Sequence, residues 1–246
     1  MAELSEHNYI IEAKGVVKKF GFKTVLRNVD LILKKGDLLA LFGHNGAGKT
    51  TLMQILCSLM RPTSGEICIA GFDLPHDSES LRQVIGVISH NTFLYTNLSA
   101  DENLRFYGMM YGVSKLSKRI EEVMTLVGLS KHLKDRVQTF SRGMQQRLSV
   151  ARAIIHDPLI LFLDEPYTGL DQHGGEELKQ LLENFRDQKK TIIMTSHDLD
   201  RGLELCTQAA ILRSGTLVYK EDIAKIDKGN FKNTYLKFTV KKPLFA

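Results

Sequence analysis

The sequence predicts an α/β fold in which a mostly parallel core sheet is joined to N-terminal antiparallel strands and interrupted by a helical insert. Three runs of apolar residues support this prediction: Leu38–Phe42, Leu159–Leu163 and Thr191–Thr195. Runs without polar alternation are typical of strands that are buried on both faces. Because helical patterns separate these runs, we expect parallel strands with helices covering both sides of the sheet.

The N-terminal segment has a different pattern, in which apolar and polar residues alternate. Tyr9–Ala13, Val25–Leu26 and Val29–Leu33 are predicted to form antiparallel strands. A helix is predicted from about Thr50 to Leu59, and the turn residues Arg61–Gly65 end it.

The middle of the chain is rich in helical patterns. Ser99 and Glu102 have the spacing of a capping box, which marks the start of a helix. Apolar residues recur at helical spacing after it, again over Ile120–Val127, and again after Ser141. We therefore predict one domain whose core comprises residues 1–89 and 156–220, with a helical segment at 90–155 and a basic tail at 221–246.

Composition is that of a globular protein, with 246 residues, 43% hydrophobic and 25% charged, and a mean hydropathy of -0.12. The net charge is +5, and the segment from Arg213 onward carries eight Lys or Arg against three acidic residues. A basic tail is able to meet nucleic acid or an anionic membrane. These lysines are scattered and no nucleic-acid-reading motif accompanies them, so we favour a solvated face and expect no nucleic-acid partner.

The cysteines and the N-terminus predict a cytoplasmic protein. Cys57, Cys68 and Cys206 lie in apolar surroundings without a C-x-x-C pair, which predicts buried, reduced thiols in a reducing compartment. No apolar run is long enough to cross a bilayer. The polar stretch Met1–Asn8 lacks the apolar core of a secretion signal.

A glycine-rich loop follows the first buried run. Its sequence has the form G-x-x-x-x-G-K-T and lies between a predicted strand and a predicted helix, the context in which such loops bind phosphates through backbone N–H groups. Lys49 supplies a full charge, and the Thr50 hydroxyl is suited to Mg²⁺. The predicted nucleotide contacts are Gly43, His44, Asn45, Gly46, Ala47, Gly48, Lys49, Thr50 and Thr51.

Polar residues also end the other two apolar runs, at the edge where parallel sheets bind ligands. Asp164 is predicted to orient Mg²⁺, Glu165 to polarise the attacking water, and His197 to reach the γ-phosphate. An acidic turn and a structural histidine are the alternative interpretation. The preceding phosphate loop favours the catalytic one.

Together these residues resemble the ATP-binding subunit of an ABC transporter, over nearly the whole stretch from Tyr9 to Tyr219. The resemblance implies that Phe20 stacks on adenine and that His197 is the switch histidine. The matching motifs are Gly43–Thr50, Ile160–Glu165, the signature sequence Phe140–Arg147 and the following loop Tyr167–Asp171.

The family resemblance also implies a mechanism. Two cassettes close head to tail over two ATP molecules, so that Ser141 and Gly143 of one contact the γ-phosphate bound by the other. Closure and reopening are passed to an integral-membrane permease subunit on the cytoplasmic face of the membrane.

Two departures from the family pattern matter. His90 lies where the family usually has Gln, and the resemblance implies that the residue there contacts Mg²⁺ and the catalytic water. A neutral His is able to accept a hydrogen bond from water or bind a metal, which predicts a retained but pH-sensitive role; the alternative is a surface histidine. Arg142 and Met144 replace the usual Gly and Gln of the signature.

The details of several segments resemble the ATP-binding subunit of the haem exporter of cytochrome c maturation. The alternatives are a transport ATPase for another substrate and a soluble ABC ATPase, such as one for iron–sulfur assembly. A P-loop kinase or GTPase does not explain the signature sequence. The segments are Ser89-His90, Leu94-Tyr95, Glu102–Tyr107, Phe140–Met144 and Tyr167–Asp171.

Overall fold

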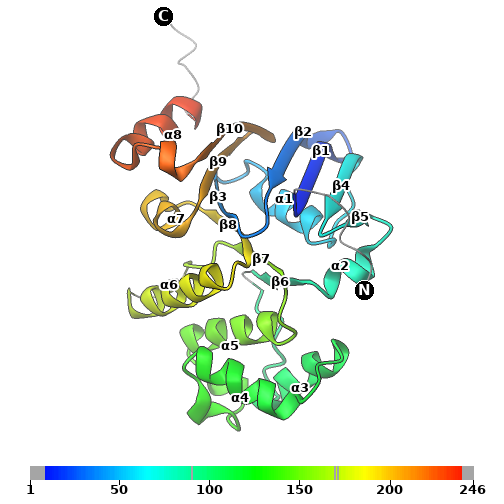
Figure 1. Cartoon of the computed structure of the whole chain (residues 1–246), viewed down its shortest axis with the longest axis vertical. Helices are drawn as coiled ribbons and strands as arrows, with labels where there is room; N and C mark the ends of the chain where they lie inside the picture. Colours follow the sequence, from blue (N-terminus) through cyan, green and yellow to red (C-terminus); the bar gives the residue numbers. More distant parts are fainter. Residues whose placement is uncertain (1–8, 90, 169, 171, 240–246) are drawn as a thin grey trace, which may run out of the picture. The chain divides into compact units, whose positions relative to one another are not determined.

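The computed structural model describes residues 9–89, 91–168, 170 and 172–239. The chain forms two compact units, which are described separately below. The first comprises Met1–Arg82 together with Thr191–Ala246, and the second comprises Gln83–Lys190. The second unit therefore includes the predicted helical segment 90–155 together with flanking strands and one further helix (Figure 1).

The first unit contains an antiparallel sheet that confirms the alternating pattern at the N-terminus. One face carries buried residues such as Ile11, Ala13 and Val16, while Lys14 faces solvent. Its strands, in the order in which they pair, are β2 (Lys23–Leu33), β1 (Ile11–Phe20), β4 (Ser64–Ile69) and β5 (Phe72–Leu74).

A second set of strands in this unit confirms the parallel core. β3 (Leu38–Phe42) is parallel to β8 (Thr191–Ser196) and to β9 (Gln208–Arg213), and β10 (Thr216–Asp222) pairs antiparallel with β9. Every residue of β3 and β8 is buried, as the continuous apolar runs require. The helices of this unit's core are α1 (Lys49–Leu56), α2 (Ser78–Arg82) and α7 (Leu199–Leu205). The predicted helix at Thr50–Leu59 is thus confirmed with shorter bounds.

The second unit confirms the three consecutive helices. Ser99 Oγ accepts a hydrogen bond from Glu102 N at 3.2 Å, and Glu102 Oε2 accepts one from Ser99 N at 2.7 Å, which completes the predicted capping box. The parallel strands are β6 (Ile85–Ile88) and β7 (Ile160–Asp164). The helices are α3 (Ala100–Met110), α4 (Leu116–Leu126), α5 (Arg142–Ile154) and α6 (Gln172–Asp187), with 3-10 turns η1 (Ser130–His132) and η2 (Val137–Thr139).

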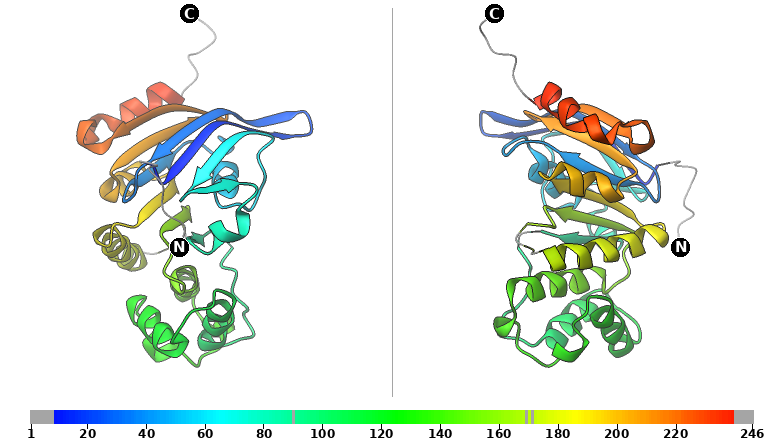
Figure 2. Two further views of the ribbon diagram at one scale, coloured as in Figure 1. Left: turned by 45° about the vertical axis from the view of Figure 1, so that its right-hand side comes forward. Right: turned by 90° about the vertical axis from the view of Figure 1, so that its left-hand side faces the viewer.

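The C-terminal segment, predicted as a basic tail, contains the 3-10 turns η3 (Ile223–Lys225) and η4 (Lys228–Asn230) and the helix α8 (Phe231–Thr239). Figure 2 shows α8 beside β9 and β10. Phe231 is 1% exposed, and its ring lies 5.4 Å from that of Phe42 and 6.2 Å from that of Tyr219. This helix therefore packs against the strand that leads into the glycine-rich loop.

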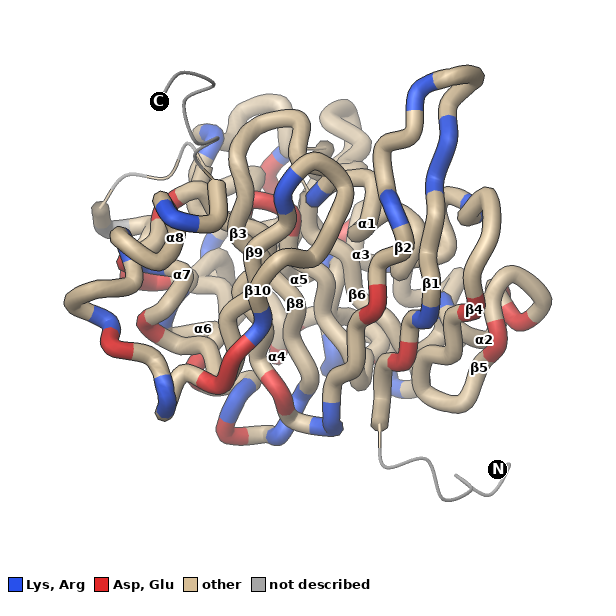
Figure 3. Tube along the Cα trace, turned by 90° about the horizontal axis from the view of Figure 1, so that it is seen from above, with Lys and Arg blue, Asp and Glu red and all other residues tan. Residues whose placement is uncertain are grey.

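The first unit also contains a basic hairpin and the three cysteines of the chain. Lys and Arg residues gather on the β1–β2 hairpin, which carries no acidic residue near its tip (Figure 3). Cys57 and Cys206 are buried, but Cys68 is only half-buried, which corrects the expectation of three buried thiols. Within the described residues, no helix combines the length and apolar character needed to span a bilayer.

Candidate nucleotide site

The loop between β3 and α1 requires glycine at two positions. Gly48, the N-cap residue of α1, has a φ of 106°, and an added Cβ would lie 2.9 Å from Leu26 Cδ2. At Gly43 an added Cβ would lie 2.5 Å from the carbonyl oxygen of Leu212. The backbone is therefore enclosed by neighbouring strands, and only residues without a side chain fit there. A loop of this kind presents its N–H groups to an anion at a helix N-terminus.

Lys49 and Thr50 follow at the start of α1. Lys49 is 7% exposed, and its Nζ donates a hydrogen bond to Gly43 O at 2.7 Å, so the ammonium group lies over the loop. Thr50 is exposed. A glycine cradle, an adjoining cation and an oxygen ligand suit a nucleoside triphosphate with Mg²⁺.

The register of the parallel strands brings His197 to the same edge. Phe42 pairs with Ser196, so Gly43 and His197 follow at neighbouring strand ends, as the sequence predicted. His197 is exposed. Asp198 caps the following helix, because its Oδ1 accepts a hydrogen bond from Arg201 N at 3.1 Å. His197 therefore lies between the end of a strand and the start of a capped helix.

Phe20 and the central loop residues are accessible. Phe20 ends β1 and is 46% exposed, with Lys18 Nζ 5.0 Å from its ring centroid. An exposed aromatic face of this kind is suited to stacking on a base. His44, Asn45 and Gly46 are exposed at the loop. Ala47 is buried, and Thr51 is half-buried on α1.

In the second unit, Asp164 and Glu165 stand at the end of β7. Asp164 is its last residue and is 7% exposed. Glu165 has a φ of 53°, in the left-handed region that is costly for any residue with a Cβ. Thr168 N donates a hydrogen bond to Glu165 O at 3.1 Å and closes the turn. Strained backbone of this kind is concentrated at functional sites.

Glu165 lines a polar hollow of about 230 Å³. Ile88 pairs with Leu163, so the residues that follow β6 emerge beside those that follow β7. His90 lies outside the described residues, but its neighbours on both sides line the hollow. The lining residues are Ser89, Asn91, Thr92, Arg142, Gln145, Gln146, Glu165, Thr168 and Leu170. Sequence reasoning did not single out Asn91 or Thr92, whose signal was their closeness to His90.

Ser141 is the N-cap of α5, and its Oγ accepts a hydrogen bond from Met144 N at 3.2 Å. Ser141 and Arg142 are exposed, and Gly143 is half-exposed in the first turn. The free N–H groups of a helix N-terminus attract anions. The predicted phosphate contacts of the signature are thus at an accessible helix start.

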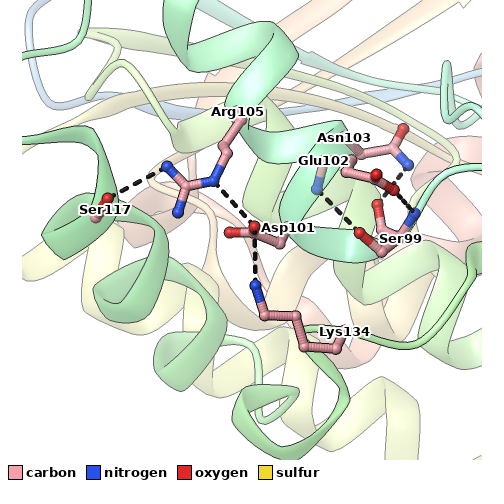
Figure 4. A network of polar contacts seen from close by, with 7 residues as sticks. All are labelled: Ser99, Asp101, Glu102, Asn103, Arg105, Ser117 and Lys134. Carbon is pink, nitrogen blue, oxygen red and sulfur yellow. Dashed lines mark hydrogen bonds and ion pairs between the residues drawn. The ribbon is translucent and has the colours of Figure 1, made fainter.

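A polar network supports the segment that precedes Ser141 (Figure 4). Asp101 Oδ2 accepts hydrogen bonds from Arg105 Nε at 2.9 Å and from Lys134 Nζ at 3.3 Å. Burial alone would raise the pKa of the Asp101 carboxyl, but these two cations lower it below its usual value. Backbone bonds from Asp101 N to Leu133 O and from Val137 N to Leu98 O run beside this network. These bonds therefore connect the start of α3 to the stretch that leads to the signature.

Comparison with known proteins agrees with this geometry. The family model described as ABC transporter matches residues 26–168. The ABC transporter ATP-binding protein NatA of Bacillus subtilis is 36% identical over 212 residues, covering 85% of this chain and 84% of NatA. The bacitracin transport ATP-binding protein BcrA of Bacillus licheniformis is 36% identical over 230 residues, covering 93% of this chain and 74% of BcrA.

A solved structure is similar over most of the chain. It is a dimeric ATP-binding cassette in a post-hydrolysis state with ADP and phosphate, 28% identical with a TM-score of 0.79. The match covers 87% of this chain and 98% of that one.

Fold and site define a nucleoside-triphosphate-binding α/β protein with a glycine-rich phosphate loop. The chain belongs to the ABC transporter family, as an ATP-binding subunit that hydrolyses ATP. The predicted fold class is confirmed.

Proposed function

We propose that this chain binds ATP with Mg²⁺ and uses its hydrolysis to drive an integral-membrane permease from the cytoplasmic face of the membrane. The observation that carries the proposal is the enclosed loop Gly43–Thr50, with the Lys49 ammonium held over it, together with Glu165 at a strand end. The similarity to ATP-binding subunits of transporters supports the same function.

The phosphates bind to the backbone of Gly43–Gly48 and to Lys49, while Phe20 stacks on the base. Thr50 and Asp164 hold the metal, with His90 as a further ligand. Thr50 and Asp164 supply oxygen donors, which Mg²⁺ prefers. When bound, Mg²⁺ offsets the charge of the phosphate oxygens.

Glu165 acts as the general base, which orients a water and accepts its proton. Its position in the lining of the polar hollow supports this role. His197 donates a hydrogen bond to the γ-phosphate, and His90 orients the water. Positioning and charge stabilisation are the main protein contributions to phosphoryl transfer.

A second cassette completes each site. Ser141 and Gly143, at the exposed start of α5, contact the γ-phosphate bound by the partner copy. The dimeric state of the similar solved cassette supports pairing, either as a homodimer or with another cassette.

Two substitutions test this assignment. Lys49→Ala removes the phosphate cation, so nucleotide binding should be lost in a fluorescent-nucleotide titration. Glu165→Gln keeps the shape and the hydrogen-bonding capacity of the side chain but not its basicity, so ATP should bind while phosphate release nearly stops.

Glu165→Gln should also dimerise on addition of ATP, which light scattering detects. The control is Glu183→Gln on α6, the same change at a side chain away from the polar hollow. Near-normal phosphate release by Glu165→Gln would refute the general-base role.

The transported substrate is a finer proposal. Resemblance at Ser89-His90 and Phe140–Met144 supports a haem exporter of cytochrome c maturation. The name of the relative BcrA supports a second candidate, export of a peptide antibiotic such as bacitracin.

Co-purification with the tagged chain tests both the partner and the substrate. An integral-membrane subunit should co-purify, and haem should stimulate ATP hydrolysis by the complex. Stimulation by bacitracin and not by haem would replace the first candidate with the second. A soluble assembly partner in place of a permease would favour an iron–sulfur assembly ATPase.

A further inference from the structure

Arg152 on α5 is a buried cation in an unusual setting. It is 8% exposed, and its Nη2 donates a hydrogen bond to Val87 O at 2.6 Å. Its guanidinium lies 5.3 Å from the ring centroid of Phe93 and 5.4 Å from that of Tyr107. Across the described ranges no carboxylate pairs with it, and its Nε has no hydrogen-bond partner.

Burying a cation without a carboxylate is unfavourable. The faces of two aromatic rings and a carbonyl oxygen offset part of that cost. Apolar packing alone would be served better by Leu or Met at this position. The guanidinium therefore suggests a role that depends on its shape and its donors.

Phe93 has a strained backbone, with a φ of 54° that is rare for a bulky residue. The Tyr107 hydroxyl donates a hydrogen bond to Phe93 O. Phe93 N donates to Asn91 Oδ1 at 3.3 Å, and the Phe93 ring lies against Arg152. Contacts from two helices thus stabilise a conformation that the chain alone disfavours.

The contacts of Arg152 fall on both sides of one short segment. Val87 precedes Ser89–Thr92 and Phe93 follows it. Ser89, Asn91 and Thr92 line the hollow that also contains Glu165. The Ser89 hydroxyl donates a hydrogen bond to Asn91 O at 3.0 Å, so the segment is also bonded internally.

We propose that Arg152 and Tyr107 are positioning residues for ATP hydrolysis, which hold Ser89, Asn91 and Thr92 in the lining of the hollow that contains the catalytic carboxylate of Glu165. Neither residue lines the hollow, so both act through the segment. The inference rests on the proposed role of Glu165 as the general base. It adds that the turnover rate depends on the strained turn at Phe93.

Tyr107→Phe is the selective test, because it removes only the hydroxyl that bonds to Phe93 O and keeps the ring on Arg152. Loss of one hydrogen bond should lower kcat about threefold to tenfold. KM for ATP should stay within about twofold of the wild-type value, because Tyr107 does not belong to the phosphate loop Gly43–Thr50. The measurement is steady-state phosphate release, with the melting temperature recorded for each variant.

Tyr95→Phe is the matched control, since Tyr95 is 50% exposed in the same aromatic group and its ring lies 6.4 Å from that of Tyr107. It should leave kcat unchanged. Equal kcat in Tyr107→Phe and Tyr95→Phe would overturn the inference. The inference would also be overturned if kcat fell only in variants whose melting temperature fell as well.

Arg152→Lys and Arg152→Met form a second test. Lysine keeps the charge but loses the planar face that contacts both rings, and methionine loses the charge as well. In both variants kcat should fall below that of Tyr107→Phe. A fluorescent ATP analogue should still bind to both. Retention of full turnover by Arg152→Met would contradict the role.

The Glu165→Gln variant separates the two proposals. If Glu165→Gln is inactive but Tyr107→Phe keeps the wild-type kcat, the proposed function stands and only this inference is removed. Turnover by Glu165→Gln would remove the proposed function and this inference with it.

Discussion

The loop Gly43–Thr50, which we propose binds the triphosphate, is built differently from the turns at Phe93 and Glu165. Gly43–Thr50 takes its shape from glycines such as Gly48, whose backbone lies where no side chain fits. The turns at Phe93 and Glu165 adopt left-handed backbone with full side chains, and contacts from α3 and α5 stabilise the one at Phe93. A phosphate cradle requires bare N–H groups, whereas a catalytic turn must present a side chain. The first design follows from local sequence, and the second depends on residues distant in the chain.

The largest effect is expected from a substitution in the glycine-rich loop Gly43–Thr50. Gly48→Ala should weaken nucleotide binding by roughly a hundredfold or more, because positive φ and a clash with Leu26 add to each other. A fluorescent-nucleotide titration measures the change.

Gly46→Ala is the matched control within the same loop. Its φ of 79° is also positive, but an added Cβ meets nothing within 4 Å. Strain alone should cost about tenfold in affinity or less. Equal losses for the two variants would show that enclosure of the loop contributes nothing.

A second prediction concerns His156, which shows how side chains shape the second unit. His156 stacks on Tyr111 with ring centroids 3.8 Å apart, and its Nε2 donates to Ile85 O at 2.9 Å. Burial lowers the pKa of His156 to about 4, with the Ile85 carbonyl opposing this and the Arg152 charge adding to it. The unfolded chain, with an ordinary His pKa near 6.5, therefore binds more protons between those two values.

Stability should consequently be lost as pH falls from about 6.5 toward 4. Between pH 7 and pH 5 this one group should cost about 1–2 kcal/mol of unfolding free energy. His156→Phe keeps a ring for stacking on Tyr111 and removes the titration, so its denaturant midpoint should change less over that range. The assignment would be contradicted if the denaturant midpoints of the wild type and of His156→Phe changed equally with pH.

The smallest expected effect concerns the cap of α5. Ser141→Ala should cost about 1 kcal/mol of unfolding free energy, because Met144 N loses its acceptor. It should also weaken ATP-induced dimerisation, as measured by light scattering.

Ser99→Ala provides the comparison, since it removes a cap of the same type from α3. It should cost a similar free energy and leave dimerisation unchanged. Weakened dimerisation in both variants would assign the effect of Ser141 to stability alone.

Sequence patterns predicted the elements whose causes are local. The apolar runs became β3, β7 and β8, and the Ser99–Glu102 capping box formed as expected. Gly43 and His197 follow two neighbouring parallel strands of the first unit, and Asp164 ends β7 in the second, so each lies at a strand end as predicted. The roles of these residues stay predictions, as does that of His90.

Contacts between distant residues were not predictable from patterns. Phe231 packs on Phe42 from a distant part of the sequence. Phe231, Tyr235 and Phe238 do recur at helical spacing in α8, a signal that the prediction of a tail did not use. The rings around Arg152 come from α3 and from the turn after β6, so no local spacing indicates them. The left-handed backbone of Glu165 is also set by its turn and not by its residue type.

The uneven burial of the three thiols makes the native sequence suitable for fluorescence work. Burial raises the pKa of the Cys206 thiol, and Cys57 is equally enclosed, so both resist alkylation. Cys68 on β4 is half-exposed, although burial and the neighbouring Asp73 raise its pKa as well. A maleimide dye applied under mildly alkaline conditions should therefore attach at one place, giving a spectroscopic reporter on the antiparallel sheet without prior removal of any cysteine.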